Sequence, residues 1–201
     1  MGIAAQLDSK NNAPATEELL KESLLLSGRR LDEVIIDLNA ILQLRNAIIE
    51  KREPICLHWL VDGIRDSIID LVRREKVTIN TDFTAIGELV SIKSYLYSIF
   101  YNLILNSIKY RQGGLDPVIE IKSALRDGLV AISFMDNGLG IDLETKRDQV
   151  FGLYKRFHSH TEGKGLGLFM VKTQMEMLGG RVTIMSKVGA GTTITLELQH
   201  H

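Results

Sequence analysis

Two asparagines one helical turn apart, Asn102 and Asn106, stand out in the otherwise apolar segment YNLILNSIKYR. Asparagine is a poor helix former, so an amide at both positions needs a reason other than helix stability. A spacing of four places both side chains on one face of a helix. An amide oxygen is a good neutral ligand for a hard cation such as magnesium, and Lys109 lies on the same side, where it can meet a phosphate. The segment therefore suits either a wet helix face or a site for a metal-bound phosphate.

The segment FMDNGLGID, residues 134–142, places Asp136 at the end of an apolar strand and puts Gly138 and Gly140 directly after it. Glycine permits a sharp turn, and it also lets a backbone approach a ligand closely. By itself, DNGLG is more often a simple turn than part of a binding site. Its interpretation depends on what the rest of the chain supplies.

A second glycine loop, GKGLGL at residues 163–168, leads into a helical pattern. It is not a P-loop, because Lys164 is followed by Gly165 rather than by Ser or Thr, and its alternating glycines do not match a dinucleotide-binding fingerprint. The N-terminus of the following helix offers free backbone N–H groups and a partial positive charge to an anion. The alternative is a plain glycine-rich entry to a helix.

The hairpin GAGTTITLEL, residues 189–198, is the last candidate segment. Its glycines fit a turn, and its paired threonines, Thr192 and Thr193, are ordinary strand residues in the simplest interpretation. Either hydroxyl can bind a ligand if the turn lies beside the pocket.

Composition limits the function classes. The chain has 201 residues, 45% of them apolar and 24% charged, and its formal net charge is -1. These values fit one or two globular domains without a basic field for nucleic acid or anionic lipid. Cys56 is the only cysteine, which excludes an internal disulfide framework and favours a cytoplasmic location. No apolar run approaches the ~20 residues of a membrane span, so we expect no membrane contact by this part of the protein.

The first 52 residues carry a helical heptad pattern. Thr16 can cap a helix in which Leu24, Leu31 and Leu38 fall seven residues apart, interleaved with a second apolar series. This pattern favours self-association as a coiled coil or helical bundle over a single amphipathic helix that lies on its own domain. Pro54 should end the helix.

The remaining residues alternate between helical and strand patterns. They predict a helix over 56–76, a strand at 76–83, a helix over 91–111, a hairpin of 118–125 and 129–136, a helix from 163 to 180, and a hairpin of 181–188 and 192–198. This order suggests an α/β fold, an α+β two-layer sandwich, in which a mixed sheet carries helices on one face. The heptad region precedes it as an N-terminal helical dimerisation arm.

Taken together, the four segments resemble the catalytic ATP-binding domain of a sensor histidine kinase, within the ATPase superfamily shared with gyrase, mismatch-repair ATPases and heat-shock chaperones. NLILNSIKY resembles the N box, DNGLG the G1 box, VFGLYKRF the F box and GKGLGL the G2 box, over about residues 75–198. The resemblance divides the chain into a partial dimerisation and phosphotransfer region (1–52), a connecting helix (53–74) and an ATP-binding catalytic domain (75–201).

The resemblance implies ATP and Mg²⁺ as ligands, and it assigns roles at the phosphate end. Asn106 would hold the magnesium with Asn102 beside it, while Lys109 and Tyr110 would contact the phosphate and the adenine or sugar region. Asn106 and Lys109 would thus be the catalytic residues. The lid would be anchored by Phe151, with Tyr154 and Phe157, and the residues near the phosphates would be Lys164, Gly165, Leu166 and Gly167.

The resemblance also assigns the base end. Asp136 would accept a hydrogen bond from the exocyclic amine of adenine, which suits a carboxylate because it has only acceptors. Gly138 and Gly140 would let the backbone approach the base, and Thr192 would lie close to the adenine.

Two features depart from the family pattern. Asp142 follows Ile141 where the family usually has a proline, and the stretch from Ile141 to Gly163 is short, which implies a small lid. His158 and His160 in that stretch are expected to be ordinary loop residues. His200 and His201 are either native or a tag, and they carry no functional assignment.

A histidine kinase also needs an acceptor histidine followed by an acid and, a few residues on, a proline, and no such motif occurs here. The resemblance implies that this chain is a fragment whose acceptor lies before Met1, so it should bind Mg-ATP without phosphorylating itself in cis. In the intact kinase, the phosphoryl group would pass to that histidine and then to an aspartate of a response regulator receiver domain. The heptad helices would form a homodimer.

Three alternatives stay open at this point. The first is a non-kinase module that uses ATP to control dimerisation or partner docking. The second is a serine kinase of the anti-sigma type, which shares the four boxes. The third is a dimerisation scaffold with an inactive pocket.

Overall fold

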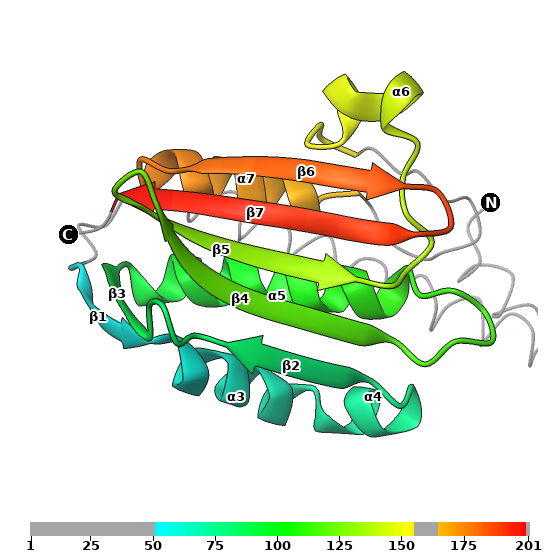
Figure 1. Cartoon of the computed structure of the whole chain (residues 1–201), viewed down its shortest axis with the longest axis horizontal. Helices are drawn as coiled ribbons and strands as arrows, with labels where there is room; N and C mark the ends of the chain where they lie inside the picture. The colour runs from blue at the N-terminus through cyan, green and yellow to red at the C-terminus, as the bar shows by residue number, and fades with distance from the viewer. Residues whose placement is uncertain (1–50, 155–164, 200–201) are drawn as a thin grey trace, which may run out of the picture. The chain divides into compact units, whose positions relative to one another are not determined.

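The computed structural model describes residues 51–154 and 165–199 (Figure 1). The heptad helix, the lid tip with Lys164 and the terminal histidines lie outside these residues. The described elements are, in order, β1 (Glu53–Cys56), α3 (Leu57–Ser67), α4 (Ile69–Arg74), β2 (Thr78–Asp82), β3 (Glu88–Ser91), α5 (Lys93–Lys109), β4 (Val118–Arg126), β5 (Leu129–Asp136), α6 (Leu143–Lys146), the 3₁₀ turn η1 (Arg147–Gln149), α7 (Gly167–Met177), β6 (Arg181–Lys187) and β7 (Gly191–Gln199).

A five-stranded mixed sheet in the order β2-β4-β5-β7-β6 forms the main layer. β2 runs parallel to β4, and every other neighbouring pair is antiparallel. Figure 1 shows α5 and α7 behind this sheet, while the viewer looks onto its uncovered face. The predicted mixed sheet with helices on one face is confirmed.

The two faces of the sheet follow from the alternation of side chains along each strand. On β5, Val130, Ile132 and Phe134 are buried against the helices, whereas Met135 is 44% exposed on the other face. Asp136 continues the even-numbered series. Its side chain therefore belongs to the helix-covered face, beyond the last apolar residue.

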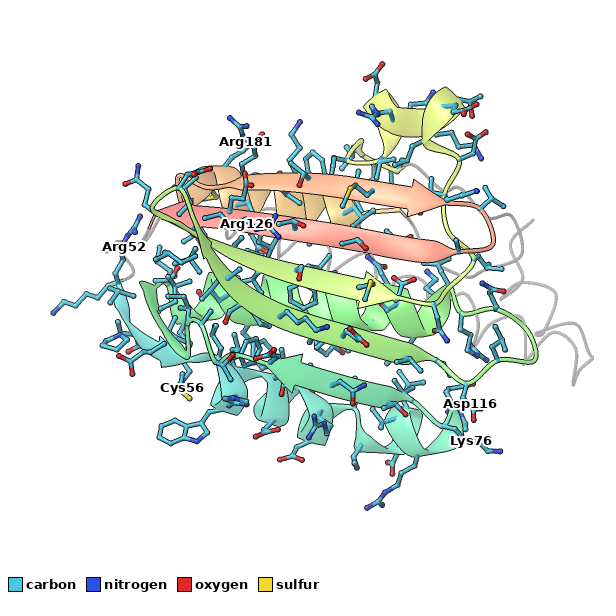
Figure 2. The ribbon with its side chains drawn as sticks, viewed as in Figure 1. Arg52, Cys56, Lys76, Asp116, Arg126 and Arg181 are labelled. Atoms are coloured by element: carbon cyan, nitrogen blue, oxygen red, sulfur yellow. The ribbon has the colours of Figure 1, made fainter. Side chains whose placement is uncertain are left out.

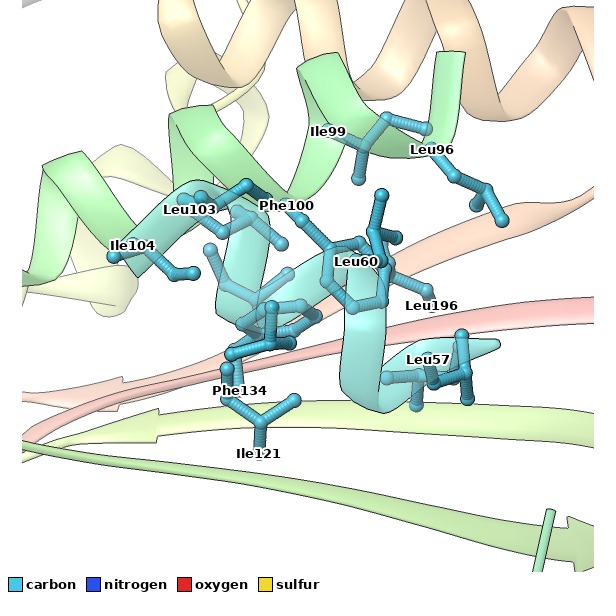
Figure 3. Close-up of a cluster of buried hydrophobic side chains, with 14 of the residues drawn as sticks. Leu57, Leu60, Leu96, Ile99, Phe100, Leu103, Ile104, Ile121, Phe134 and Leu196 are labelled. Atoms are coloured by element: carbon cyan, nitrogen blue, oxygen red, sulfur yellow. The ribbon is translucent and has the colours of Figure 1, made fainter. Parts of the chain in front are cut away.

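The core joins this face to the helices (Figure 3). α5 contributes the largest share, with Leu96, Ile99, Phe100, Leu103 and Ile104 all buried. The Phe100 ring meets the Phe134 ring edge to face, with 4.8 Å between centroids, and this contact fixes α5 over β5. The end of α5 is thereby held near the end of β5, where the polar residues begin.

The segment expected to be a connecting helix is part of this same core. Leu57, Leu60, Val61 and Ile64 of α3 are buried in it, and β1 pairs with β3 in a small antiparallel sheet. The predicted single helix over residues 56–76 is broken at Ile68, so that α3 and α4 are separate. Neither β1 nor β3 was predicted, because each has only four residues and no clear alternation.

The turns follow their sequence signals. Asp127 and Gly128 both have positive φ, of 50° and 78°, which is the geometry of a two-residue hairpin turn between β4 and β5. After α7, Gly179 has φ of 76°, and the N–H of Gly180 bonds the carbonyl of Met175, so the predicted glycine stop is confirmed. The helix predicted over residues 91–111 is two residues shorter at each end, since α5 runs from Lys93 to Lys109.

No helix among the described residues is both long and apolar enough to cross a membrane.

Candidate functional site

A row of polar side chains crosses three neighbouring strands at one end of the sheet. Asp136 of β5 pairs with Thr192 of β7, which in turn pairs with Ser186 of β6. The next row inward is apolar, with Phe134, Ile194 and Ile184 in the same order. Because residues paired across strands share a face, the three polar side chains lie on the helix-covered face. The row marks the point where the apolar core gives way to a site.

Asp136 makes three hydrogen bonds within the protein. Its Oδ1 accepts from the backbone N–H of Gly138 at 2.9 Å and from that of Thr192 at 3.1 Å. Its Oδ2 accepts from the hydroxyl of Ser107 at 3.1 Å. Burial raises the pKa of the Asp136 carboxyl above its ordinary value, although these three hydrogen bonds act in the opposite direction. A carboxylate has about four acceptor sites, so Oδ2 retains capacity for one more donor.

Ser107 brings α5 into the site. It lies on the buried face of the helix, one turn after Leu103, and its hydroxyl is within 3.1 Å of both the Leu103 carbonyl and Asp136 Oδ2. The helix that carries Asn102 and Asn106 is therefore linked directly to the carboxylate at the end of β5.

Three glycines around Asp136 are required by the protein's own backbone. Gly191 has φ of 91°, and a Cβ there would overlap the Asp136 carbonyl. Gly140 has φ of 67°, and a Cβ there would overlap the Lys187 carbonyl. A Cβ at Gly138 would be 2.6 Å from the Tyr110 carbonyl oxygen. Gly138 and Gly140 thus have an intramolecular reason, whereas the resemblance explained them by close approach to a base.

Gln112 joins the two turns that border the carboxylate. Its Nε2 donates to the carbonyls of Asn137, Gly138 and Gly189, at 3.2, 2.9 and 3.0 Å. Leu139 completes the connection, since its N–H donates to the Tyr110 carbonyl and its own carbonyl accepts from Gly189, each at 2.8 Å. The end of α5, the G1 turn and the β6–β7 turn therefore form one hydrogen-bonded unit.

Asn137 anchors the same turn to the start of β4. Its Oδ1 accepts from the N–H of Val118 at 2.9 Å, and its Nδ2 donates to the Asp116 carbonyl at 3.0 Å. Figure 2 labels Asp116 near this end of the sheet and Arg52 near the opposite end. The position of Asp136 is thus fixed from both neighbouring strands.

The two amides of α5 meet the start of α7. Asn102 donates from Nδ2 to the Ser98 carbonyl at 2.8 Å, which turns its Oδ1 outward. A Cβ at Gly167 would be 3.1 Å from Asn102 Oδ1 and 3.3 Å from Asn106 Nδ2. A side chain at this position would press on both amides, which would have to shift by a few tenths of an ångström. The two asparagines, predicted to share a helix face, therefore converge on the glycine loop that was singled out separately.

The N-terminus of α7 carries no side-chain cap and no acidic residue in its first turn. Gly165, just before it, has φ of 72°, and Leu166 is buried. The first backbone N–H groups of α7 have no partner within the helix, and they carry the positive end of the helix dipole. This helix end suits an anion beside the amides.

The other residues implied by the resemblance fall at the end of α5 and in the turn that follows η1. Lys109 and Tyr110 follow the amides at the end of α5, where the N–H of Tyr110 donates to the Asn106 carbonyl at 2.9 Å. The Nζ of Lys109 is 5.1 Å from the centre of the Tyr110 ring. Phe151 is half-buried in the turn after η1, and Tyr154 is 61% exposed with φ of 58°. Of these four residues, Tyr110 is tied directly to Asn106 through its backbone.

Asp142 explains one departure from the family pattern. It caps α6, because its Oδ1 accepts from the N–H of Glu144 at 3.0 Å and its Oδ2 from the Thr145 hydroxyl at 2.8 Å. Where the family usually has a proline, this chain begins a short helix with a capping carboxylate.

A groove of about 520 Å³ opens on the other face of the sheet. It is lined mainly by residues of the uncovered face, among them Met135, Met185 and Thr193. It reaches the strand ends that carry Asp136 and Thr192, but their side chains belong to the opposite face. The groove is therefore a separate surface from the candidate site.

Sequence reasoning missed Ser107, Gln112 and Ser186. Ser107 stands next to Asn106, and the 3.6-residue period that places Phe100, Leu103 and Ile104 in the core also places it there. Ser186 follows Val182 and Ile184 in the inward series of β6, so a polar residue in an apolar alternation was the available signal. No sequence signal identified Gln112, because its partners come from two distant turns.

Comparison with known proteins identifies the family. The profile described as Histidine kinase-, DNA gyrase B-, and HSP90-like ATPase matches residues 92–201, and the chain belongs to this family. The resemblance found in the four boxes is confirmed.

Individual relatives are named histidine kinases. The Histidine protein kinase SaeS of Staphylococcus epidermidis is 25% identical, over 89% of this chain and 52% of that protein. The Sensor-like histidine kinase SenX3 of Mycolicibacterium smegmatis is 28% identical, over 99% of this chain and 52% of that protein. The chain thus spans about half the length of these curated relatives.

Solved structures share the fold. The histidine kinase AdeS of Acinetobacter baumannii has a TM-score of 0.74 at 19% identity, covering 99% of this chain and 91% of that one. Full-length ShkA in complex with AMPPNP also has a TM-score of 0.74, at 21% identity, covering 98% of this chain and 42% of that one.

Proposed function

We propose that this chain is the ATP-binding kinase core of a two-component sensor histidine kinase. The observation that carries the proposal is the meeting of two polar groups at one end of the fold. The amides of Asn102 and Asn106 converge on Gly167, and Ser107, on the same helix, holds the carboxylate of Asp136. Helix α5 would thus link two parts of one site: the phosphate end, at Asn102 and Asn106, for magnesium and phosphate, and the base end, at Asp136, for the nucleotide base.

The base end supplies acceptors for an exocyclic amine. Asp136 Oδ2 has an acceptor site left after its bond from Ser107, and a carboxylate in a half-buried site makes a strong bond to an N–H donor. Adenine presents such an amine. Guanine presents a carbonyl at the same position, which the carboxylate would repel.

The phosphate end suits Mg²⁺. Amide oxygens and phosphate oxygens are hard neutral and anionic ligands of the kind that Mg²⁺ prefers. Asn106 would be the protein ligand, with Asn102 beside it, and both amides lie close to Gly167 at the start of α7. Magnesium would neutralise phosphate charge there.

The contribution of the chain to phosphoryl transfer would be positioning. Transfer of a γ-phosphoryl group needs little covalent help from the protein, so orientation and charge neutralisation dominate. The uncapped N-terminus of α7 would hold phosphate oxygens through backbone N–H groups. Lys109, Tyr110, Lys164, Gly165 and Leu166 would complete the contacts, and Phe151 would anchor the lid.

The acceptor would be a histidine outside residues 1–201, and the phosphoryl group would pass from it to an aspartate of a response regulator receiver domain. We further propose that the heptad helices of residues 1–52 form a homodimer. The histidine kinase names of the relatives support this function over an ATP-dependent docking module.

The experiment that tests the proposed function has two stages. Calorimetry should detect ATP binding that requires Mg²⁺, and Asn106→Ala should remove most of the Mg²⁺ dependence. The chain is then incubated with labelled ATP and a helical hairpin that carries a His-acid-x-x-x-Pro motif. An acid-labile phosphohistidine supports the proposal. An acid-stable product would indicate a serine kinase, and binding without transfer would indicate the non-kinase module.

A further inference from the structure

Ser186 makes hydrogen bonds to three partners at the edge of the base end. Its Oγ accepts from the N–H of Ile141 at 2.8 Å, donates to the Gly191 carbonyl at 2.9 Å, and lies 2.8 Å from the hydroxyl of Thr192. A serine hydroxyl has one proton and two lone pairs. These three contacts therefore use its full capacity.

The direction of the Thr192 bond follows from this capacity. Either hydroxyl can donate in the Ser186–Thr192 contact, but only one arrangement satisfies all three contacts of Ser186 at once. In that arrangement the proton of Ser186 goes to the Gly191 carbonyl, and the Thr192 hydroxyl donates its own single proton to Ser186. Toward any ligand, Thr192 then presents lone pairs alone.

Thr192 lies directly across from Asp136 in the paired strands, and its backbone N–H also bonds Asp136 Oδ1. The base end thus presents two acceptors side by side, the Oδ2 of Asp136 and the Oγ1 of Thr192. An exocyclic amine has two N–H donors, which match two acceptors. A base with a carbonyl at the same place would be repelled, because its oxygen would face lone pairs of both Asp136 and Thr192.

We propose that Ser186 is a positioning residue that sets the choice of purine by holding the hydroxyl proton of Thr192 away from the base. This inference rests on the proposed ATP site. Ser186 itself need not touch the nucleotide, since it acts through Thr192. Ser186 also accepts from the N–H of Ile141, so the position of the G1 turn affects which purine is preferred.

The test compares binding of Mg-ATP with binding of Mg-ITP, whose base carries a carbonyl in place of the amine. Wild-type chain should prefer ATP. Ser186→Ala frees the Thr192 proton to rotate and donate to the carbonyl, so the ratio of the two dissociation constants should narrow by about fivefold or more. Ser133→Ala, a matched change on the uncovered face of the same sheet, should leave the ratio unchanged.

Thr192→Val provides a second variant that keeps the backbone bond to Asp136. It should also narrow the ratio, and adding Ser186→Ala to it should cause no further change. If Ser186→Ala does not fold, an unaltered ratio in Thr192→Val overturns the inference. An unaltered ratio in a folded Ser186→Ala variant that binds ATP overturns it as well. If wild-type chain binds no Mg-ATP, the proposed function fails, and the inference fails with it.

Discussion

At the scale of single residues, Asp136 has two opposed properties. It is a buried carboxylate, which costs free energy in the empty fold, and it is the acceptor that the proposed adenine site needs. Three hydrogen bonds hold it in place without neutralising its charge. A residue that is unfavourable for the fold and well held by it is typical of a functional position.

Replacing Asp136 with asparagine should weaken the binding of ATP. The new side-chain amide would offer N–H groups where the amine of adenine needs an acceptor, so ATP affinity should fall by about 10- to 100-fold. Calorimetry with Mg-ATP measures this loss. Retained affinity would contradict the assigned role of the carboxylate.

The same Asp136→Asn variant should raise the stability of the nucleotide-free fold at neutral pH. Because burial raises the pKa of Asp136 above its value of 3.8 in the unfolded chain, the native state binds more protons between the two pKa values. The free energy of unfolding of the wild type therefore falls as pH rises through that window. Urea denaturation should show an advantage for the variant at pH 7 that shrinks toward acid pH. A wild type that is more stable than the variant at pH 7 would contradict this sign.

Gly191 and Gly189 allow a matched comparison of how much an added side chain lowers the free energy of unfolding. Both have positive φ, but a Cβ at Gly189 meets nothing within 4 Å, whereas one at Gly191 overlaps the Asp136 carbonyl. Gly189→Ala should cost about 1 kcal/mol of unfolding free energy, and Gly191→Ala more than about 3 kcal/mol. Denaturation midpoints measure both. Equal costs would show that strand β7 can move away from β5.

At the scale of elements, the site is made by turns that one helix end holds together. Gln112, after α5, bonds the G1 turn and the β6–β7 turn through a single nitrogen. These turns come from distant parts of the sequence, and the Gln112 side chain holds their spacing together with the backbone bonds of Leu139. The floor of the base end is therefore set from outside the strands that carry Asp136 and Thr192.

Gln112→Glu should loosen this unit. The substitution keeps the shape but replaces the donor with a carboxylate that faces three carbonyls, and it should cost about 1–3 kcal/mol of unfolding free energy. Hydrogen exchange at the N–H groups of Leu139 and Gly189 should quicken. Gln112→Met, which removes the donor without adding charge, should have the smaller effect. Unchanged hydrogen exchange in both variants would show that the turns keep their structure without the Gln112 side chain.

The sequence predicts these elements where a local signal exists. Alternation in β4, β5 and β7 was sufficient, and the glycines after α7 marked its end. β1 and β3 escaped prediction because a four-residue strand is defined by its partner rather than by its own pattern. In the candidate site, Asn106 and Asp136 were assigned through motif order. Ser186 and Gln112 depend on strand register and turn packing, which a linear sequence does not show.

At the scale of the whole molecule, the structure places the start of the folded unit earlier than the family resemblance does. α3 supplies buried residues to the core, and β1 pairs with β3 in a small sheet of their own. The compact unit includes residues 53–74 as well as the residues of the four boxes.

Truncation tests this boundary. A chain that begins at residue 50 should fold cooperatively and bind Mg-ATP, whereas one that begins at residue 75 exposes the apolar surface that α3 covers and should aggregate. Light scattering and circular dichroism distinguish the two. A monomeric, folded chain that starts at residue 75 would show that α3 is dispensable.

The strand order has a consequence for biosynthesis. β7 is the last of the five strands in sequence, yet it lies between β5 and β6, in the interior of the sheet. Until it has left the ribosome, β5 and β6 have no strand to join them, and Asp136 lacks the backbone partner on Thr192. A nascent chain therefore carries the β5 edge unpaired from residue 136 until β7 emerges, whereas β6 waits for only a few residues. An unpaired edge is prone to aggregation, so chaperones or fast closure by β7 would protect the chain during that interval.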